Sequence, residues 1–95
     1  MYLGQMMTKA PIVYGSRRHD ALVALRVLRK PSTCIEIKQL FPKIGTNDQL
    51  THALRDLVVK SLVIKVDENH YQITNYGVNA LKVVAKDTAS RPHKD

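Results

Sequence analysis

The chain has little of what marks a secreted or membrane protein. It contains one cysteine, Cys34, which cannot form an internal disulfide bond. No apolar run approaches the roughly 20 residues that cross a bilayer. The N-terminus also lacks the basic start and apolar stretch of a secretory signal. We therefore expect no membrane insertion, and a location in the cytoplasm of a prokaryote or of a viral host, associated with the nucleoid.

Groups that could support catalysis are also scarce. His19, His52, His70 and His93 show no spacing typical of a metal site, and no glycine-rich loop is present that would hold a phosphate. With 95 residues, the chain can form one small domain but is too short to enclose a large catalytic cleft. We expect no enzymatic activity, no metal and no cofactor. We interpret Cys34 as a buried structural thiol, with oxidant sensing as the open alternative.

Acidic residues are few compared with basic ones. Eight Asp and Glu stand against fifteen Lys and Arg, which gives a net charge of +7 and a sequence pI near 9.8. Residues 16–62 hold nine basic and four acidic side chains, so +5 of the +7 lies there. A positive charge that is concentrated in this way favours a polyanionic partner such as nucleic acid.

Composition divides the chain into three parts. Residues 1–15 form an apolar arm, which contains all three Met and two Tyr and is expected to include a short extended piece near 11–14. An apolar segment of this kind normally covers a surface, either of its own domain or of a second subunit. Residues 16–86 carry the periodic patterns of a folded domain. Residues 87–95 lack a core-forming pattern and are expected to be a flexible tail.

Periodicity and capping signals within the domain predict an α+β fold that is mostly α. The predicted elements are helices at 17–30, at 34–41 and from 46 onward, strands at 62–66 and 70–74, and a last helix at 75–86. A Ser or Thr precedes each helix as a potential N-cap, and Thr33 with Glu36 and Thr46 with Gln49 have the spacing of a capping box. A short helix, a tight turn, a longer helix and a hairpin are the order of a winged helix-turn-helix.

Each predicted helix has an apolar side that is expected to pack inward. These positions are Ala21, Leu22, Ala24, Leu25, Val27 and Leu28 in the first helix, Ile35 or Ile37 with Leu40 in the second, Leu50, Ala53, Leu54, Leu57 and Val58 in the third, and Tyr76, Ala80, Leu81, Val83 and Val84 in the last. The opposite side of the third helix holds polar residues, which are therefore left for contact with a partner.

The stretch IEIKQLFPKIGTNDQLTHALRDLVVKSLVIK, followed by YQITNYGVNAL, resembles the HxlR branch of the MarR-like winged-helix transcription regulators. The pattern of that family runs F-x-E-L, P-x-I-[ST], L-T-x-x-L-R-x-L, G-L-V and Y-x-L-T-x-x-G. The positions that match are Leu40, Pro42, Ile44, Thr46, Leu50, Thr51, Leu54, Arg55, Leu57, Leu62, Val63, Tyr71, Ile73, Thr74 and Gly77. The resemblance covers residues 33–82.

This resemblance implies a homodimer that binds double-stranded DNA and regulates transcription. The helix that starts at 46 would enter the major groove, and the hairpin would lie along the backbone as the wing. Family dimers are built from terminal segments, so the N-terminal arm and the C-terminal helix become the candidate dimer elements.

The candidate DNA-binding residues combine groups that read bases with groups that neutralise phosphates. Those on the third helix are Thr46, Asn47, Gln49, Thr51, His52 and Arg55, and the expected phosphate contacts are Lys43, Lys65, Arg17 and Arg18. Arg55 suits guanine or a phosphate, although a salt bridge with Asp48 or Asp56 is the alternative. Gln49 suits adenine, but its place in the capping box competes for the same side chain.

Three departures from the family pattern affect this interpretation. Ser61 stands where the family usually has Gly, at a helix end that favours a left-handed residue. The predicted wing is short and carries Asp67 and Glu68, which phosphates would repel. Val58 and Val59 stand where the family commonly has an acidic pair, which leaves Val59 on the polar side of the third helix. The alternatives are therefore a winged-helix module that binds another protein, or an accessory DNA-binding protein of a mobile element.

Overall fold

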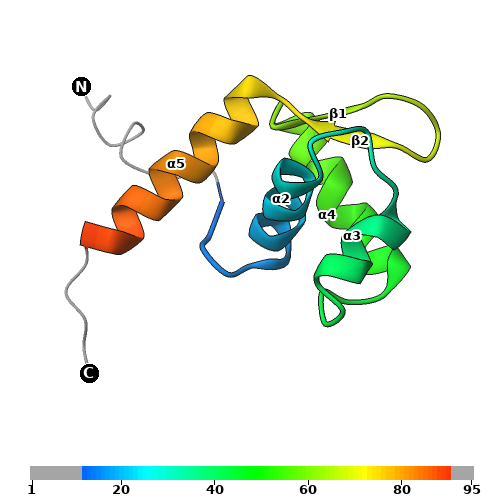
Figure 1. The fold of residues 1–95 in the computed structure, drawn as a ribbon, viewed down its shortest axis with the longest axis horizontal. Coiled ribbons are helices and arrows are strands. Elements are labelled where there is room, and N and C mark those ends of the chain that lie inside the picture. Colours follow the sequence, from blue (N-terminus) through cyan, green and yellow to red (C-terminus); the bar gives the residue numbers. More distant parts are fainter. Residues whose placement is uncertain (1–11, 91–95) are drawn as a thin grey trace.

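A computed structural model of the chain describes residues 12–90, with side chains described through residue 84. The elements are α2 (Arg17–Leu28), α3 (Cys34–Leu40), α4 (Asn47–Val59), β1 (Val63–Lys65), β2 (Tyr71–Ile73) and α5 (Asn75–Ser90). The predicted α+β class, mostly helical and with one antiparallel hairpin, is confirmed for this part of the chain (Figure 1). Within residues 12–90, no helix combines the length and the apolar character needed to cross a membrane.

The predicted caps set the starts of the helices. Ser16, Thr33 and Thr46 each accept a hydrogen bond from the backbone N–H three residues later, and Thr33 and Thr46 both complete a capping box. Thr74 Oγ1 accepts from the N–H of Gly77 at 2.9 Å, at the start of α5. These bonds satisfy backbone donors that have no partner inside the helix, so the helix boundaries follow from local chemistry.

The core forms around α2, which contacts α3, α4, α5 and β2. Leu22 and Leu25 of α2 are fully buried, as are Leu50, Leu54 and Leu57 of α4. Ile37 rather than Ile35 is the buried residue of α3. Several positions that were expected to pack inward are exposed instead: Val27 by 60%, Leu40 by 42%, Tyr76 by 59% and Val83 by 50%. The apolar stripes are therefore narrower than the sequence pattern predicts.

The hairpin pairs Val63 with Ile73 and Lys65 with Tyr71, so its strands are shorter than predicted. Tyr71 also exchanges two backbone hydrogen bonds of 2.8 Å with Ser32, which lies between α2 and α3. This bridge attaches the α2–α3 connection to the hairpin. It fixes the position of α3 relative to β2.

Helix ends differ from the prediction where the backbone departs from helical angles. The first helix stops at Leu28 instead of residue 30, because Arg29 takes a left-handed conformation with φ 59°. The last helix continues to Ser90 instead of residue 86, so the first residues of the predicted tail are helical.

The predicted arm is only partly described. The extended piece predicted near 11–14 is wrong, because Ser16 N–H donates to the carbonyl of Val13 and closes a turn. Ile12 is buried in the core, so the folded domain begins before residue 16. The remainder of the arm, residues 1–11, and the end of the tail, residues 91–95, lie outside the described residues.

Two tight positions connect α4, the hairpin and α5. Ser61 is left-handed with φ 66°, and the N–H of Leu62 donates to the carbonyl of Leu57 at 2.9 Å, which is the pattern of a Schellman motif. Gly77 packs so closely that a Cβ there would overlap the carbonyl of Leu62 and lie 2.7 Å from Ile73 Cγ1. With its φ of 66°, Ser61 adopts the left-handed conformation that was expected to favour Gly at this position.

Candidate nucleic-acid interface

The exposed side of α4 offers one row of polar residues to a groove. Asn47, Thr51 and Arg55 follow each other at one-turn spacing and line a groove of about 610 Å³. Its other walls are the start of α3 and the hairpin, through Thr33, Cys34, Ile35, Lys65, Glu68, Asn69, His70 and Tyr71. The structure thus brings together four of the predicted site residues, namely Asn47, Thr51, Arg55 and Lys65.

Arg55 is available at this groove. Its side chain is exposed, and within residues 12–84 it forms no hydrogen bond or ion pair. The predicted alternative, a salt bridge to Asp56, is wrong because Asp56 pairs with Arg18 instead. Asp48 forms no ion pair with Arg55 either, within the described residues. Burial raises the pKa of the nearby Tyr71 hydroxyl, and the positive charge of Arg55 acts in the opposite direction.

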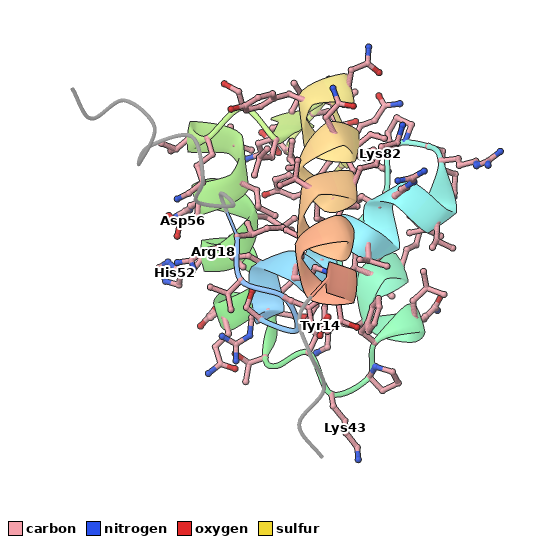
Figure 2. The ribbon with its side chains drawn as sticks, turned by 90° about the vertical axis from the view of Figure 1, so that its left-hand side faces the viewer. Tyr14, Arg18, Lys43, His52, Asp56 and Lys82 are labelled. Atoms are coloured by element: carbon pink, nitrogen blue, oxygen red, sulfur yellow. The ribbon has the colours of Figure 1, made fainter. Side chains whose placement is uncertain are left out.

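Arg18 and Asp56 mark the other edge of α4. Arg18 donates to Asp56 Oδ2 through Nη2 at 2.6 Å and through Nε at 2.9 Å, and about half of each side chain is exposed. His52 lies next to this pair in a hollow of about 260 Å³ (Figure 2). The exposed side of α4 therefore has an open arginine, Arg55, along one edge and a neutralised arginine along the other.

Three predicted site residues have structural roles. Gln49 Oε1 accepts from the Thr46 N–H at 3.0 Å, and Thr46 Oγ1 accepts from the Gln49 N–H at 3.1 Å. The capping interaction therefore uses the Gln49 oxygen that a base contact would need. Arg17 Nε donates to the carbonyl of Ile44 at 2.6 Å and holds the turn before α4. That turn includes Gly45, whose φ of 127° suits only glycine.

Two lysines extend the basic surface beyond the groove. Lys38 of α3 donates to Asn47 Oδ1 at 3.3 Å, so it lies beside the N-terminus of α4. Lys43 is exposed on the turn between α3 and α4, away from Arg18 and His52 (Figure 2). Lys43 lines a different hollow, with Phe41 and Ile44, and is not among the residues that line the groove of Arg55 and Lys65.

The tip of the hairpin is built on Asp67. Its Oδ1 accepts from the backbone N–H groups of Asn69 and His70 and contacts His70 Nδ1 at 2.8 Å. The hydrogen bond from His70 and that from the Asn69 N–H hold the pKa of the Asp67 carboxyl below its ordinary value. The carboxylate that was expected to repel phosphates is thus engaged in the turn. Glu68 remains exposed, without a hydrogen bond in the described residues.

Tyr71 is one of seven residues that line the groove and were not predicted as site members; the others are Thr33, Cys34, Ile35, Glu68, Asn69 and His70. Tyr71 is buried, and Lys65 Nζ lies 5.9 Å from the centre of its ring. The predicted hairpin could have indicated it, because Tyr71 pairs with Lys65, which was a candidate residue. Cys34 is half-buried rather than buried, and its Sγ lies 3.9 Å from Thr51 Oγ1.

Charged, polar and apolar groups are mixed on the exposed side. Besides Arg55 it carries Asp48, His52 and Val59, and Val59 is 81% exposed. Carboxylate, guanidinium and methyl groups can each recognise a different base edge, namely cytosine N4, guanine and the thymine methyl group. The same mixture can also contact a protein.

Compared with models of known protein families, with curated proteins and with solved structures, the chain gives no significant match in any of the three comparisons.

Proposed function

We propose that this chain is a winged helix-turn-helix protein that binds double-stranded DNA with sequence preference and regulates transcription as a homodimer. In this proposal α4 enters the major groove, α3 supports it, and the β1–β2 hairpin is the wing. The observation that carries the proposal is the row of Asn47, Thr51 and Arg55 along α4, facing a groove whose far wall carries Lys65.

Size and chemistry support α4 as the element that reads bases. A helix with its side chains is about 10–12 Å across, and the major groove is about 12 Å wide. Arg55 is exposed without a protein partner in the described residues, so it can offer its planar fork to guanine O6 and N7. Thr51 and Asn47, one and two turns before it, can reach a base edge or a phosphate.

Phosphate contacts are available on both sides of α4. Lys65 lies on the hairpin side, and Lys38 lies beside the N-terminus of α4. Arg18 lies at the opposite edge, although Asp56 neutralises it. Lys43 can reach the backbone only if the DNA extends past the α3–α4 turn. The net charge of +5 in residues 16–62 supports binding to a polyanion.

The dimer part of the proposal is supported by α5. This helix extends away from the rest of the domain at its C-terminal end (Figure 1). Tyr76 is 59% exposed and Val83 is 50% exposed. They lie seven residues apart, which is about two helical turns, so both fall on the same flank of the helix. A second copy could cover them. The two α4 helices would then meet half-sites about one helical turn, or 34–36 Å, apart.

One observation favours a second candidate function. Val59 is 81% exposed at the end of α4, and Ile64 of β1 is 49% exposed. Apolar side chains in these positions suit contact with another protein, so a protein-binding winged-helix module is the alternative. An accessory DNA-binding role in a mobile element would use the same surface as the regulator.

The test is binding of duplex DNA over a series of salt concentrations. We expect log K to fall linearly with log salt, as it does when phosphates are neutralised. Arg55→Ala should weaken binding to the preferred sequence by about tenfold or more, because a bidentate arginine–guanine contact contributes about 1–3 kcal/mol. The matched control is Arg26→Ala, which removes an exposed arginine that lines neither the groove beside Arg55 nor the hollow beside Arg18.

The outcomes separate the candidates. If the wild-type chain fails to bind both random and genomic fragments at low salt, DNA binding is refuted. If Arg55→Ala and Arg26→Ala weaken binding equally, α4 does not read bases. The protein-binding module is favoured if the wild-type chain does not bind DNA but does bind another protein, and if Val59→Asp abolishes that protein binding.

A further inference from the structure

A second groove lies between α2 and α5. It has a volume of about 550 Å³ and is lined by His19, Val23, Arg26, Val27, Arg29, Leu81 and Lys82. None of these residues lines the groove beside Asn47, Thr51 and Arg55. Lys82 lies on the other side of α5 from Arg18, His52 and Asp56 (Figure 2). The α2–α5 groove is therefore a surface separate from the proposed DNA interface.

This groove has an apolar floor and a cationic rim. Leu81 is buried, Val23 is partly buried against the core, and Val27 is 60% exposed. Arg26, Arg29 and Lys82 supply three positive charges, and no acidic residue is among the described residues that line the groove. Apolar groups surrounded by charges of one sign form a surface that recognises apolar side chains flanked by the opposite charge.

Two of the cations are well suited to carboxylates. The left-handed backbone of Arg29 ends α2, and its N–H donates to the carbonyl of Leu25 at 3.1 Å, so the base of this side chain is fixed. Arg26 lies on the last turn of α2 beside Val27. A guanidinium binds a carboxylate through two parallel hydrogen bonds, which gives both strength and orientation.

The terminal segments of the chain do not complement this charge. Residues 1–11 contain no Asp or Glu. Residues 85–95 contain Lys86, Arg91 and Lys94 against Asp87 and Asp95, a balance of +1. A second copy of the chain carries a net charge of +7 as a whole, so charge complementarity favours a different partner.

We propose that the α2–α5 groove is a docking site for an acidic amphipathic helix of another protein. Aliphatic or aromatic residues on one face of that helix contact Val23, Val27 and Leu81. Its Asp and Glu residues pair with Arg26, Arg29 and Lys82. α2 is 12 residues long, about 18 Å at the helical rise, which matches roughly three turns of a partner helix. A helix in an apolar groove is a common mode of peptide recognition.

This inference does not depend on DNA binding. Because the two grooves share no residue, a chain bound to DNA would leave the α2–α5 groove open to its partner. The site would then connect the DNA-bound protein to a second protein that carries an acidic helix.

The probe is a fluorescent synthetic helical peptide with Leu at positions i, i+3, i+4 and i+7 and Glu at the flanking positions. Binding to the full chain is measured by fluorescence anisotropy. Two control peptides accompany it, one with the same composition in shuffled order and one with Lys in place of Glu. We expect the acidic amphipathic peptide to bind at least about tenfold more tightly than either control.

Variants locate the site. Val27→Asp and the double variant Arg26→Glu with Lys82→Glu should each weaken binding of the acidic peptide by about tenfold or more. The double variant should gain binding of the Lys peptide. Lys43→Glu reverses an exposed charge outside the groove and should change peptide binding by less than about twofold, because salt screens distant charges.

Several results would overturn the docking site. Lys43→Glu changes the net charge by −2 and the double variant changes it by −4, so a Lys43 loss in binding free energy of half that of the double variant would show that peptide binding depends only on net charge. Failure of the Lys peptide to gain affinity for the double variant would contradict charge pairing in the groove. Dissociation of a wild-type dimer by Val27→Asp, seen in analytical ultracentrifugation, would show that a second copy covers the groove. DNA binding is measured on the same variants, so failure of one proposal is distinguishable from failure of the other.

Discussion

If the chain binds DNA as proposed, replacing Asp56 with Asn should strengthen that binding. Arg18 makes two hydrogen bonds to Asp56 Oδ2, at 2.6 and 2.9 Å, and both side chains are about half exposed. An exposed ion pair of this kind contributes only about 0–1 kcal/mol to stability. The variant should therefore fold. Its Arg18 guanidinium keeps at most a neutral amide acceptor and can exchange it for a phosphate at the edge of α4.

The expected size of the gain follows from counterion release. One additional phosphate contact steepens the slope of log K against log salt by about 0.9. If the variant and the wild-type chain bind equally at 1 M salt, the variant should bind about eightfold more tightly at 0.1 M salt. The assay is fluorescence anisotropy with duplex DNA over a series of salt concentrations, and circular dichroism confirms that the variant is folded.

Two controls decide whether Arg18 is the cause. Asp20→Asn raises the net charge by the same amount, but Asp20 lines a separate hollow with Leu40 and Pro42. The double variant Arg18→Ala with Asp56→Asn removes the freed arginine. An equal gain in the Asp20 variant, or a gain that persists without Arg18, would refute the placement of Arg18 beside the DNA backbone.

Three further predictions concern stability. Ser61→Gly should raise the free energy of unfolding by about 0.5–1 kcal/mol. The left-handed conformation costs an L-residue about 1–2 kcal/mol, and the greater conformational freedom of Gly in the unfolded chain offsets part of that gain. A lower melting temperature of the variant in calorimetry would contradict this prediction. Gly77→Ala should lower the free energy of unfolding by about 1–3 kcal/mol, because the added Cβ overlaps the carbonyl of Leu62. Urea denaturation measures this change. An unchanged urea midpoint of unfolding would show that α5 shifts without cost. The hydrogen bond from His70 lowers the pKa of Asp67, so the stability that Asp67 gives the hairpin is present above the ordinary pKa of about 3.9 and is lost as the pH falls through the lowered value. A carboxyl NMR titration of Asp67 with its midpoint at or above that ordinary value would contradict this assignment.

Local chemistry explains why much of the fold was predictable. Ser16, Thr33, Thr46 and Thr74 each provide a cap, and a cap depends on a hydroxyl at a fixed distance along the chain rather than on the rest of the fold. The starts of the helices are therefore where the sequence places them. The end of α2 was missed because Arg29 takes a left-handed conformation, which Gly or Asn would have signalled and Arg does not.

The burial of individual apolar residues was less predictable. Val27, Tyr76 and Val83 fit the helical period, but only a narrow side of α2 and α5 meets the core. Periodicity indicates which residues share a side of a helix. It does not indicate how wide a surface the neighbouring elements cover, since that depends on tertiary packing.

The sequence indicated the residue types of the candidate site but not their partners. Arg55 and Lys65 were named as separate candidates, and the structure shows that both line the same groove. Arg17, Arg18 and Gln49 were chosen by the same reasoning, yet each has an intramolecular partner, namely the carbonyl of Ile44, Asp56 and the N–H of Thr46. Two of these contacts span more than 25 residues of sequence, and no local pattern predicts them.

The acidic residues of α4 do not all act in the same way. Asp56 forms an ion pair with Arg18, and the positive charge of Arg18 partly cancels the repulsion that Asp56 would exert on a phosphate. Asp48 is exposed in the first turn of α4, where the helix dipole stabilises a carboxylate. In the proposed complex, a phosphate approaching the N-terminus of α4 would meet Asp48 and Lys38, whereas one approaching from the hairpin would meet Lys65 and Arg55 against the single carboxylate of Glu68. The balance of charge is thus more positive on the hairpin side, and we expect the DNA to approach from there, with Asp48 left to accept a hydrogen bond from a base such as cytosine.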